Sequence, residues 1–220
     1  MEIKAIATMK SDFPEKFGIP RQSGLVSGLY GRVVFEKEYA VPEAIRGLDG
    51  YSHIWLIWGF SLARRDGWSP TVRPPRLGGN TRMGVFATRS PFRPNPLGLS
   101  CVRLVGIENG ELIVEGADLA DGTPIYDIKP YLPYADAKPE AVGGFASAAP
   151  ERRLTVGGEA LTSLPPDKRE ALIGVLACDP RPSYQDDPER VYGFSFAGYE
   201  VKFRVEGDKA VVTEIEKAEK

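Results

Sequence analysis

RPPRLGGNTRMGVFATRSPFRPNPLGLS, the sequence of residues Arg73–Ser100, restricts the fold of this chain more than any other segment. It contains five prolines, which fix the backbone and lack an amide donor, and four glycines, which permit positive φ angles. A long helix is incompatible with this composition. The pattern therefore predicts a stiff, ordered loop with at most one short strand, at Gly84–Thr88.

This arginine-rich segment also carries five arginines and neither a lysine nor an acidic residue. A guanidinium group binds the two oxygens of a phosphate or a carboxylate through paired hydrogen bonds. An ordinary surface loop is the alternative, but such loops usually mix arginine with lysine, aspartate and glutamate. We therefore predict that the arginine-rich segment binds an anion.

The distribution of charge along the chain supports a specific anionic partner. The formal net charge is −2, but residues 67–107 carry six arginines and no acid, whereas residues 108–220 carry 13 bases and 22 acids. A local positive patch on an acidic chain favours one specific anion over indiscriminate binding of nucleic acid.

Composition places the chain among ordinary globular proteins. Its 220 residues, 42% of them hydrophobic, suffice for one large or two small domains. The sequence has no run of 18 apolar residues that would predict a membrane span, and its N-terminus lacks a signal-peptide core. Cys101 and Cys178 are isolated and the chain has one histidine, so we expect a cytoplasmic protein without a metal site.

The segment Tyr51–Leu62 (YSHIWLIWGFSL) is apolar on both faces, which predicts a central strand of a sheet or barrel. His53 lies near its start, where a structural role is more common for a lone histidine than a catalytic one. Alternation and turn signals predict further strands at Ile3–Thr8, Leu29–Phe35, Cys101–Ile107, Glu111–Ala117 and Ile125–Ile128. The fold class that follows is mainly β, with a barrel-like first domain.

The C-terminal third of the chain predicts a small α+β domain. A helix at Leu164–Ala177, capped by Ser163, precedes a meander of strands at Val191–Phe196, Tyr199–Glu206 and Ala210–Ile215. The segment before the helix is rich in alanine, glycine, proline and serine, as linkers are. We therefore expect a barrel-like domain at residues 1–140, a linker at 141–158 and a small α+β domain at 159–220.

Motifs for several common chemistries are missing from the sequence. It has no GxxxxGK[ST] phosphate loop, no strand followed by GxGxxG, and no GxSxG nucleophile elbow. The residues alone therefore indicate a β-rich domain with an arginine-lined anionic site, without naming a reaction.

Three blocks together closely resemble the TsaA-like, or TrmO, family of tRNA (adenine-N6)-methyltransferases. They are PRQSGL (Pro20–Leu25), the arginine-rich segment, and DGTPIYDIKPYLPYAD (Asp121–Asp136). The later DPRPSY (Asp179–Tyr184) resembles the C-terminal domain of bacterial members, so the resemblance runs from about Ile3 to the end of the chain. Three long blocks in the same order are a more specific signal than one short motif.

The resemblance implies a β-barrel that binds S-adenosylmethionine and methylates the exocyclic nitrogen of threonylcarbamoyl-adenosine beside the anticodon of threonine-type tRNAs. It also implies a homodimer with the cofactor near the subunit interface. The implied cofactor contacts are Pro20, Arg21, Gln22, Ser61, Leu62, Arg89, Leu99, Tyr126, Asp127, Ile128 and Lys129. Other members often have His-Gln where this chain has Ser61-Leu62.

The acceptor nitrogen implied by the resemblance carries an acyl group, so it is a poor nucleophile until its proton leaves, and a proton acceptor is useful. Asp127 is our hypothesis for that acceptor, with orientation of the cofactor as its alternative role. Lys129 would hold Asp127 or a substrate carboxylate, and a solvated ion pair is the plainer alternative for both residues. The residues expected to contact tRNA are Arg73, Arg76, Arg82, Arg93, Asn95, Arg181 and Tyr184.

Two other functions stay open on the sequence alone. A non-catalytic module that clamps RNA or a nucleotide would use the same arginines without binding S-adenosylmethionine tightly. A methyltransferase of the same fold that acts on a small molecule would bind the cofactor, but its affinity for tRNA would not depend on salt.

Overall fold

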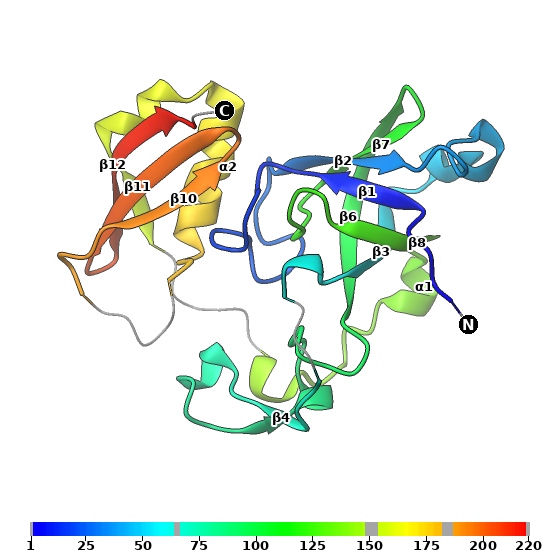
Figure 1. The fold of residues 1–220 in the computed structure, drawn as a ribbon, viewed down its shortest axis with the longest axis horizontal. Helices are drawn as coiled ribbons and strands as arrows, with labels where there is room; N and C mark the ends of the chain where they lie inside the picture. The colour runs from blue at the N-terminus through cyan, green and yellow to red at the C-terminus, as the bar shows by residue number, and fades with distance from the viewer. Residues whose placement is uncertain (1, 64–66, 148–153, 182–186, 219–220) are drawn as a thin grey trace.

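The computed structural model describes residues 2–63, 67–147, 154–181 and 187–218 (Figure 1). A β-barrel and a smaller sheet with one long helix lie side by side in it (Figure 1). This mainly β, two-part architecture confirms the fold class that the sequence predicts. None of the helices within the described ranges has the length and apolar character needed to cross a membrane.

Six strands, all in antiparallel pairs, form the closed barrel. In order around the barrel they are β1 (Ala7–Lys10), β2 (Tyr30–Phe35), β7 (Glu111–Glu115), β6 (Leu97–Glu108), β3 (His53–Gly59) and β8 (Pro124–Pro130). The first strand pairs with both β2 and β8, which closes the sheet and leaves it without a free edge.

Side chains that alternate along the strands fill the barrel. In β3, Ile54, Leu56 and Trp58 are buried, whereas Trp55 and Ile57 between them are only partly buried on the outer face. Opposite orientation of successive side chains in a strand produces this division. Because β3 lies between β6 and β8, the predicted central position of this strand is confirmed.

The arginine-rich segment is largely irregular, as predicted, but its short strand lies earlier than expected. Met83–Gly84 forms β5, which pairs with β4 (Thr71–Val72) in a two-residue ribbon, and Val85–Ala87 forms a turn of 3-10 helix. Other short helical turns are Pro42–Ile45, Leu48–Gly50, Ser61–Ala63, Pro75–Leu77, Gly144–Ala146, Glu159–Ser163 and α1 (Pro133–Asp136). Before β6 begins at Leu97, the prolines and glycines of the arginine-rich segment thus confine its regular structure to short pieces.

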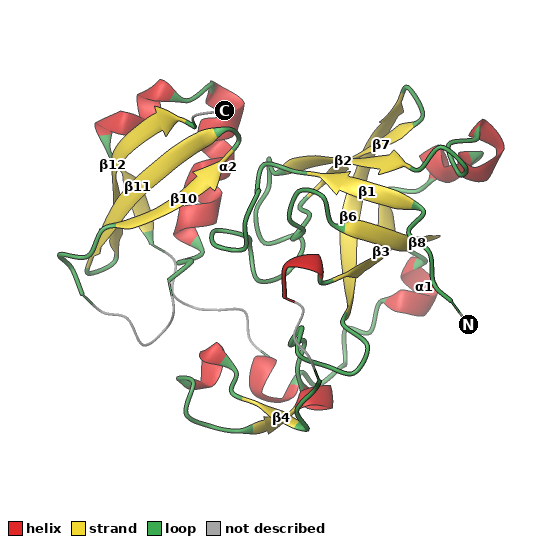
Figure 2. Ribbon diagram, viewed as in Figure 1, coloured by secondary structure: helices red, strands yellow, loops and turns green. Residues whose placement is uncertain are grey.

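The C-terminal domain is a four-stranded sheet with a helix packed on one face (Figure 2). The strand order is β10 (Tyr192–Phe196), β11 (Tyr199–Glu206), β12 (Lys209–Lys217) and β9 (Thr155–Gly157), and the helix is α2 (Pro166–Ala177). The meander of β10, β11 and β12 agrees with the sequence prediction.

Two boundaries in this domain differ from the prediction. Residues of β9 lie within the predicted linker, but they pair in parallel with β12, and Leu154 just before them is buried. Two glycines, at 157 and 158, made this short strand resemble a linker. Helix α2 begins at Pro166, after Pro165, and no side chain caps it, so the predicted cap at Ser163 is wrong. Proline suits the first helical position because its missing amide needs no partner there.

The β1–β2 loop, residues 11–29, packs into the C-terminal domain (Figure 1). Phe13, Val26 and Leu29 are buried in the same apolar cluster as the helix and strands of that domain. The approach is close, because a Cβ atom at Gly18 would lie 2.6 Å from the ring of Phe194. Residues far apart in the sequence therefore share one hydrophobic core. The division of the chain into consecutive domains, at 1–140 and 159–220, overlooks this shared core.

Candidate active site

A cavity of about 540 Å³ lies where β3 ends and β6 begins. Its volume is within the range of small-molecule sites in proteins, roughly 300–1,000 Å³. The residues that line it belong to four parts of the chain, within 16–22, 58–63, 89–99 and 118–123. The β1–β2 loop and the arginine-rich segment therefore meet at the same end of the barrel.

One wall of the cavity is apolar and aromatic. Its residues are Trp58, Phe60, Leu62, Leu97 and Leu99. The rings of Trp58 and Phe60 meet edge to face, with centroids 4.4 Å apart. Gly98 permits this arrangement, because a Cβ atom there would lie 2.2 Å from the indole of Trp58. Such a wall suits a planar ring such as a nucleobase.

Basic side chains give the cavity a positive charge. They are Lys16, Arg21, Arg89 and Arg93. Arg89 donates a hydrogen bond from Nη1 to Oε1 of Gln22, which joins the arginine-rich segment to the β1–β2 loop. Arg93 donates from Nη1 to the carbonyl oxygen of Thr88 at 3.1 Å. The cavity can therefore bind a carboxylate or a phosphate group.

Asp118 is the one acid among the described residues that line the cavity. The hydroxyl of Ser100 donates to its Oδ1 at 2.5 Å, and Nε1 of Trp58 donates to the Ser100 hydroxyl at 2.9 Å. Burial raises the pKa of Asp118, although the hydrogen bond from Ser100 and the charge of Arg89 oppose that rise. These contacts hold a carboxyl group whose ionised form is costly without a cationic partner.

The structure brings together many of the residues that the resemblance implies as cofactor contacts. Those that line the cavity are Pro20, Arg21, Gln22, Ser61, Leu62, Arg89 and Leu99. They come from the β1–β2 loop, from the 3-10 helix after β3, and from the arginine-rich segment. Arg93 and Asn95, predicted to contact tRNA, line the same cavity.

The remaining predicted cofactor contacts, Tyr126–Lys129, lie in β8 and are not among the residues that line the cavity. On the outer face of the barrel, Ile57 is the register partner of Leu99 on one side and of Asp127 on the other. Directly opposite residues share a face, so these three form a row that starts at the cavity. Oδ2 of Asp127 lies 2.9 Å from Nζ of Lys129, and both side chains are about half exposed.

A β-bulge interrupts the pairing of β3 with β8 at Tyr126. Ile57 faces Asp127, but the next residue of β3, Trp58, faces Ile125. Such a bulge redirects the side chain of the extra residue. The Tyr126 hydroxyl lies close to Gly59, where a Cβ atom would come within 2.6 Å of it. Glycine at this position therefore permits the approach of Tyr126 to the end of β3.

The arginines predicted to contact tRNA have different surroundings. Arg73 and Arg82 are exposed, and Nη1 of Arg82 donates to the hydroxyl of Thr71 at 3.1 Å. Both arginines flank the ribbon of β4 and β5 and are accessible to a large anion. The side chain of Arg76 and the whole of Tyr184 lie outside the described residues.

Arg181 occupies a different environment from the one predicted. It is 3% exposed, and its Nε lies 2.8 Å from Oδ1 of Asp179. Its carbonyl oxygen accepts a hydrogen bond of 3.1 Å from Nη2 of Arg21. Burial in an ion pair argues against contact of Arg181 with RNA, and its backbone instead supports a residue of the cavity.

Sequence reasoning did not single out two exposed aromatic residues beside the arginine-rich segment. Trp68 and Phe86 are 53% and 72% exposed, and their rings stack with centroids 6.3 Å apart and planes inclined by 27°. They flank β4 and β5, and the amide of Val85 donates to the carbonyl of Pro70 at 2.9 Å between them. Large aromatic residues in a stretch of sequence with arginines and no acidic residue were the signal that could have identified this surface.

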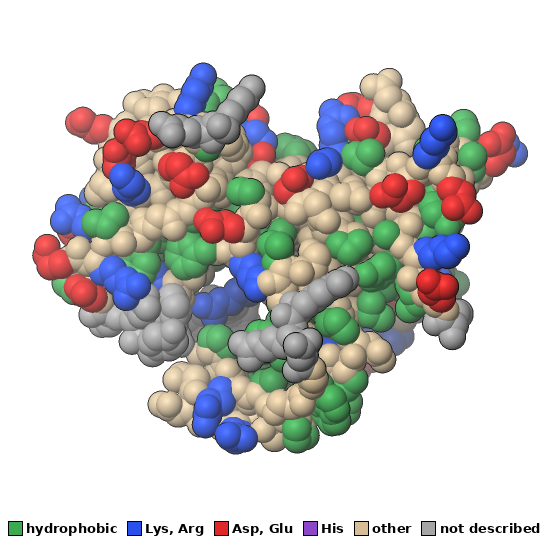
Figure 3. All heavy atoms as spheres, viewed as in Figure 1, with side chains coloured by type: hydrophobic (Ala, Val, Ile, Leu, Met, Phe, Trp, Pro, Cys, Tyr) green, Lys and Arg blue, Asp and Glu red, His purple; other side chains and the backbone are tan. Residues whose placement is uncertain are grey.

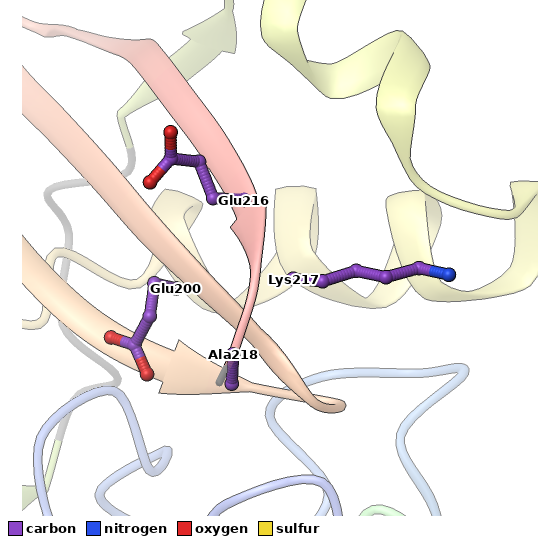
Figure 4. A pocket seen from close by; sticks show the side chains of 4 residues that line it. All are labelled: Glu200, Glu216, Lys217 and Ala218. Carbon is purple, nitrogen blue, oxygen red and sulfur yellow. The ribbon is translucent and has the colours of Figure 1, made fainter. Parts of the chain in front are cut away.

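A second hollow lies in the C-terminal domain and is lined by Glu200, Glu216, Lys217 and Ala218 (Figure 4). The two glutamates project from neighbouring strands, whereas the side chain of Lys217 points away from them (Figure 4). Two carboxylates side by side repel a phosphate or carboxylate ligand. The cavity at the end of the barrel is therefore the candidate active site.

Comparison with known proteins places this architecture in one family. The model of the tRNA-methyltransferase O N-terminal domain matches residues 8–137, and that of the TrmO C-terminal domain matches residues 157–218. The chain is 41% identical over 218 residues to the tRNA (adenine(37)-N6)-methyltransferase of Escherichia coli strain K12, covering 93% of each protein. It is 50% identical over 167 residues to the protein of the same name from Eikenella corrodens, covering 74% of this chain and 95% of that protein.

A solved structure agrees with these matches. The crystal structure of TrmO from Pseudomonas aeruginosa matches this chain with a TM-score of 0.80 at 32% identity, over 98% of this chain and 97% of that one. The likeness thus covers the barrel and the C-terminal sheet alike. This chain belongs to the tRNA-methyltransferase O family.

Proposed function

We propose that the protein is an S-adenosylmethionine-dependent tRNA methyltransferase. Its acceptor is the exocyclic nitrogen of threonylcarbamoyl-adenosine next to the anticodon of threonine-type tRNAs. The observation that carries this proposal is the cavity, in which implied cofactor contacts from three chain segments meet, one of them the arginine-rich segment. The Escherichia coli relative, which is named for methylation at adenine 37, supports the same reaction.

The residues that line the cavity fit the parts of S-adenosylmethionine. The wall formed by Trp58, Phe60 and Leu99 suits the adenine, and Arg89 suits the carboxylate of the methionine part. When bound, this cofactor supplies an electrophilic methyl group. We assign its binding to Pro20, Arg21, Gln22, Ser61, Leu62, Arg89 and Leu99, with Tyr126, Ile128 and Lys129 of β8.

The acceptor nitrogen needs a group that takes up its proton, because the acyl substituent makes it a poor nucleophile. We assign that task to Asp127, which lies in the same row of the outer face as Leu99 of the cavity. Two strand spacings, about 10 Å, separate their backbones, which leaves room for a nucleobase between the cavity and the carboxylate. Lys129, 2.9 Å from Asp127, holds that side chain or binds the carboxylate of the threonyl group.

We assign the contact with tRNA to the exposed surface around β4 and β5. Arg73 and Arg82 bind backbone phosphates there, while Trp68 and Phe86 offer ring faces to unpaired bases. Single-stranded RNA loops are commonly bound in this way, by stacking combined with contacts to phosphate. Arg93 and Asn95, at the cavity, bind the acceptor nucleotide itself.

We also propose a homodimer that acts in the cytoplasm. Leu97, Leu99 and Val105 lie on the outer face of β6 and are 36%, 54% and 45% exposed, with Cys101 and the exposed Arg103 between the last two. Exposed apolar side chains on this face suit burial against a second copy of the chain. Because Leu97 and Leu99 also line the cavity, a second copy on this face would help to enclose the cofactor. A tRNA substrate favours the cytoplasm, and so does a sequence with only two, isolated cysteines.

The reaction is tested with labelled S-adenosylmethionine and two tRNA pools, one carrying threonylcarbamoyl-adenosine and one lacking it. We expect transfer of label to the modified pool alone. Transfer to neither pool, with measurable binding of the cofactor, would favour a small-molecule methyltransferase. If the protein neither transfers label nor binds the cofactor, a passive RNA-binding module is the better account.

The role of Asp127 is tested separately with Asp127→Asn. Loss of the proton acceptor should lower turnover by about 100-fold or more, with an unchanged dissociation constant for S-adenosylmethionine. The control is Asp49→Asn, which changes an exposed aspartate in the 3-10 helix Leu48–Gly50 and should leave both quantities unchanged. Loss of cofactor binding in Asp127→Asn would instead assign Asp127 to orientation of the cofactor.

A further inference from the structure

Asp118 is the acidic residue that lines the cavity, and the proposed function gives it no role. The described residues of the lining include four basic side chains and this single carboxyl group. We propose that Asp118 binds the ammonium group of the methionine part of S-adenosylmethionine, beside Arg89, which binds its carboxylate. The inference rests on the proposed function, because it requires this cofactor in the cavity.

The combination of Arg89 and Asp118 matches the two charged ends of an amino acid. An α-amino acid carries its ammonium and its carboxylate on one carbon atom, so a site for it needs an anion and a cation near each other. Arg89 and Asp118 line the same cavity, and the charge of Arg89 opposes the rise in the pKa of Asp118. The two side chains reach the cavity from different parts of the chain, the arginine-rich segment and the loop between β7 and β8.

Ser100 fixes the orientation of the Asp118 carboxyl group. A serine hydroxyl has one proton, and Trp58 donates to the oxygen of Ser100 at 2.9 Å, so that proton points to Oδ1 of Asp118 at 2.5 Å. Ser100 is 1% exposed and lies in β6, which anchors this hydrogen-bond chain in the barrel wall. The backbone groups of Ser23 and of Asp118 itself also oppose the rise in the pKa of this carboxyl group. A carboxylate has about four acceptor sites, so capacity for a ligand remains.

Because Asp118 is largely buried, a bound cation would stabilise its ionised carboxylate. An ionised carboxylate away from water is costly unless a positive group joins it, and the neighbouring wall of Trp58 and Phe60 is apolar. Burial is accordingly the largest influence on the pKa of Asp118, and it raises that pKa. An ammonium group bound beside Asp118 would offset the cost, so binding of the cofactor and ionisation of Asp118 favour each other.

A purely structural role for Asp118 makes a different prediction. The backbone of Ser23, in the β1–β2 loop, opposes the rise in the pKa of Asp118, so the carboxyl group could serve only to hold that loop in place. Loss of a loop anchor would weaken the binding of every ligand of the cavity. Loss of an ammonium partner would weaken the binding of only those ligands that contain the amino-acid part.

The test is calorimetric titration of Asp118→Asn with S-adenosylmethionine, S-adenosylhomocysteine and 5′-methylthioadenosine, which lacks the amino-acid part. We expect the first two to bind about 10- to 100-fold more weakly, by the same factor, and the third to bind as it does to the unchanged protein. A loss for all three would assign Asp118 to the loop, and a loss for S-adenosylmethionine alone would assign it to the sulfonium. Either result, or no loss at all, would overturn the proposal.

Two controls keep failure of this inference distinct from failure of the proposed function. Asp49→Asn should bind all three ligands normally, since Asp49 is exposed. If the unchanged protein binds none of them, the proposed function itself is wrong and the inference falls with it.

A second variant and a second measurement apply if Asp118→Asn does not fold. Ser100→Ala keeps the carboxylate but loses its orientation, and should show a smaller loss with the same ligand pattern. In the unchanged protein, lowering the pH should weaken the binding of S-adenosylmethionine but not that of 5′-methylthioadenosine. Protonation of Asp118 removes the negative charge that binds the ammonium group. The other charged side chains that line the cavity are the basic residues Lys16, Arg21, Arg89 and Arg93. Parallel weakening of both ligands would contradict the proposal.

Discussion

The β1–β2 loop and the arginine-rich segment both line the cavity, yet they are held in different ways. The loop is packed into a second domain: the rings of Phe13 and Phe196 have centroids 5.3 Å apart, and Nζ of Lys168 lies 2.6 Å from Oδ2 of Asp12. Support for the arginine-rich segment before Leu97 comes from the two-residue ribbon of β4 and β5 and from short turns, and only its last four residues join the barrel as the start of β6. One side of the site is thus fixed by a core, and the other is built from a stiff but exposed chain.

The two segments also differ in the charge of the surface around them. On the face shown in Figure 3, the lobe that contains β4 carries basic side chains and no acidic ones, in keeping with the sequence of residues 67–107. A surface that contacts RNA gains from accessible cations and ring faces. A small cofactor must be held at fixed distances for methyl transfer, so the part that binds it gains from close packing. The difference suggests that the two segments serve two ligands of different size.

The largest expected effect comes from loosening the β1–β2 loop. Phe194 is 2% exposed and its ring lies against Gly18. Phe194→Ala should lower the free energy of unfolding by about 3–5 kcal/mol, because it leaves a cavity in the shared core. Urea denaturation measures this loss, and titration should show weaker binding of S-adenosylmethionine.

The matched control for Phe194→Ala is the same change on the exposed segment. Phe86 is 72% exposed, so Phe86→Ala should change the free energy of unfolding by less than about 0.5 kcal/mol. It should weaken tRNA binding instead, because a stacking surface is lost. Equal destabilisation by the two changes would contradict the contrast between the segments.

A smaller effect is expected from Gly98→Ala, at the meeting point of the two segments. The new Cβ atom would lie 2.2 Å from the indole of Trp58, and overpacking of this kind costs about 1–3 kcal/mol. Displacement of the indole should break its hydrogen bond to Ser100 and weaken S-adenosylmethionine binding, with tRNA binding retained. Gly84→Ala is the control, because nothing lies within 4 Å of a Cβ atom there. Unchanged cofactor affinity in Gly98→Ala would show that the indole does not form part of the site.

The exposed arginines should affect tRNA alone. Arg73→Ala and Arg82→Ala should each weaken tRNA binding and reduce the slope of log affinity against log salt by about 1, since each removes one phosphate contact. Fluorescence titration at several salt concentrations measures the slope. Arg46→Ala, at an exposed arginine in the chain between β2 and β3, should leave it unchanged. A weaker affinity for S-adenosylmethionine in Arg73→Ala would place that residue at the cofactor and not at the RNA.

The smallest effect concerns the attachment of the β1–β2 loop to the barrel. The amide of Gly28 donates to Oε1 of Glu115 at 2.8 Å, and this bond, followed by the bond from Arg103, lowers the pKa of Glu115. A lowered pKa means that the stabilisation is complete at neutral pH and is lost as the pH falls below the ordinary glutamate value, about 4.3, towards the folded-state pKa. Glu115→Gln should therefore cost about 1 kcal/mol at pH 7 and remove that acid-side loss. Denaturation curves of both proteins across acidic pH would show an identical pH dependence if this account were wrong.

Local patterns in the sequence predicted the strands of the barrel but not its closure. The apolar character of both faces identified the segment that became β3, in which one face is buried in the barrel and the other is partly buried on its outside. Closure depends on the pairing of β1 with β8, which lie more than 100 residues apart and carry no local signal for each other. The strand β9 was missed for a similar reason, since three residues gain their structure from a distant partner, β12.

The residues of the candidate active site likewise could be predicted only in part from local sequence patterns. Pro20, Arg89 and Leu99 were found because the blocks around them resemble a known family, and the fold then brought them to one cavity. Asp118 stands in no motif, and its importance becomes visible only when Ser100 and the apolar wall surround it. Contact of Arg181 with RNA stays a prediction, and burial of its guanidinium in an ion pair with Asp179, two residues before it, argues against that role.

The burial of Phe13, Val26 and Leu29 in the C-terminal core means that the two halves of this protein are not interchangeable modules. A fragment that ends near residue 140 would carry these side chains without their cover, and the complementary fragment would have a gap in its interior. Grafting another second domain onto this barrel would require redesign of residues 11–29, and with them of the wall that holds the cofactor. Fragment complementation, in which the two pieces reassemble without a covalent connection, is accordingly a more natural experiment for this fold than truncation.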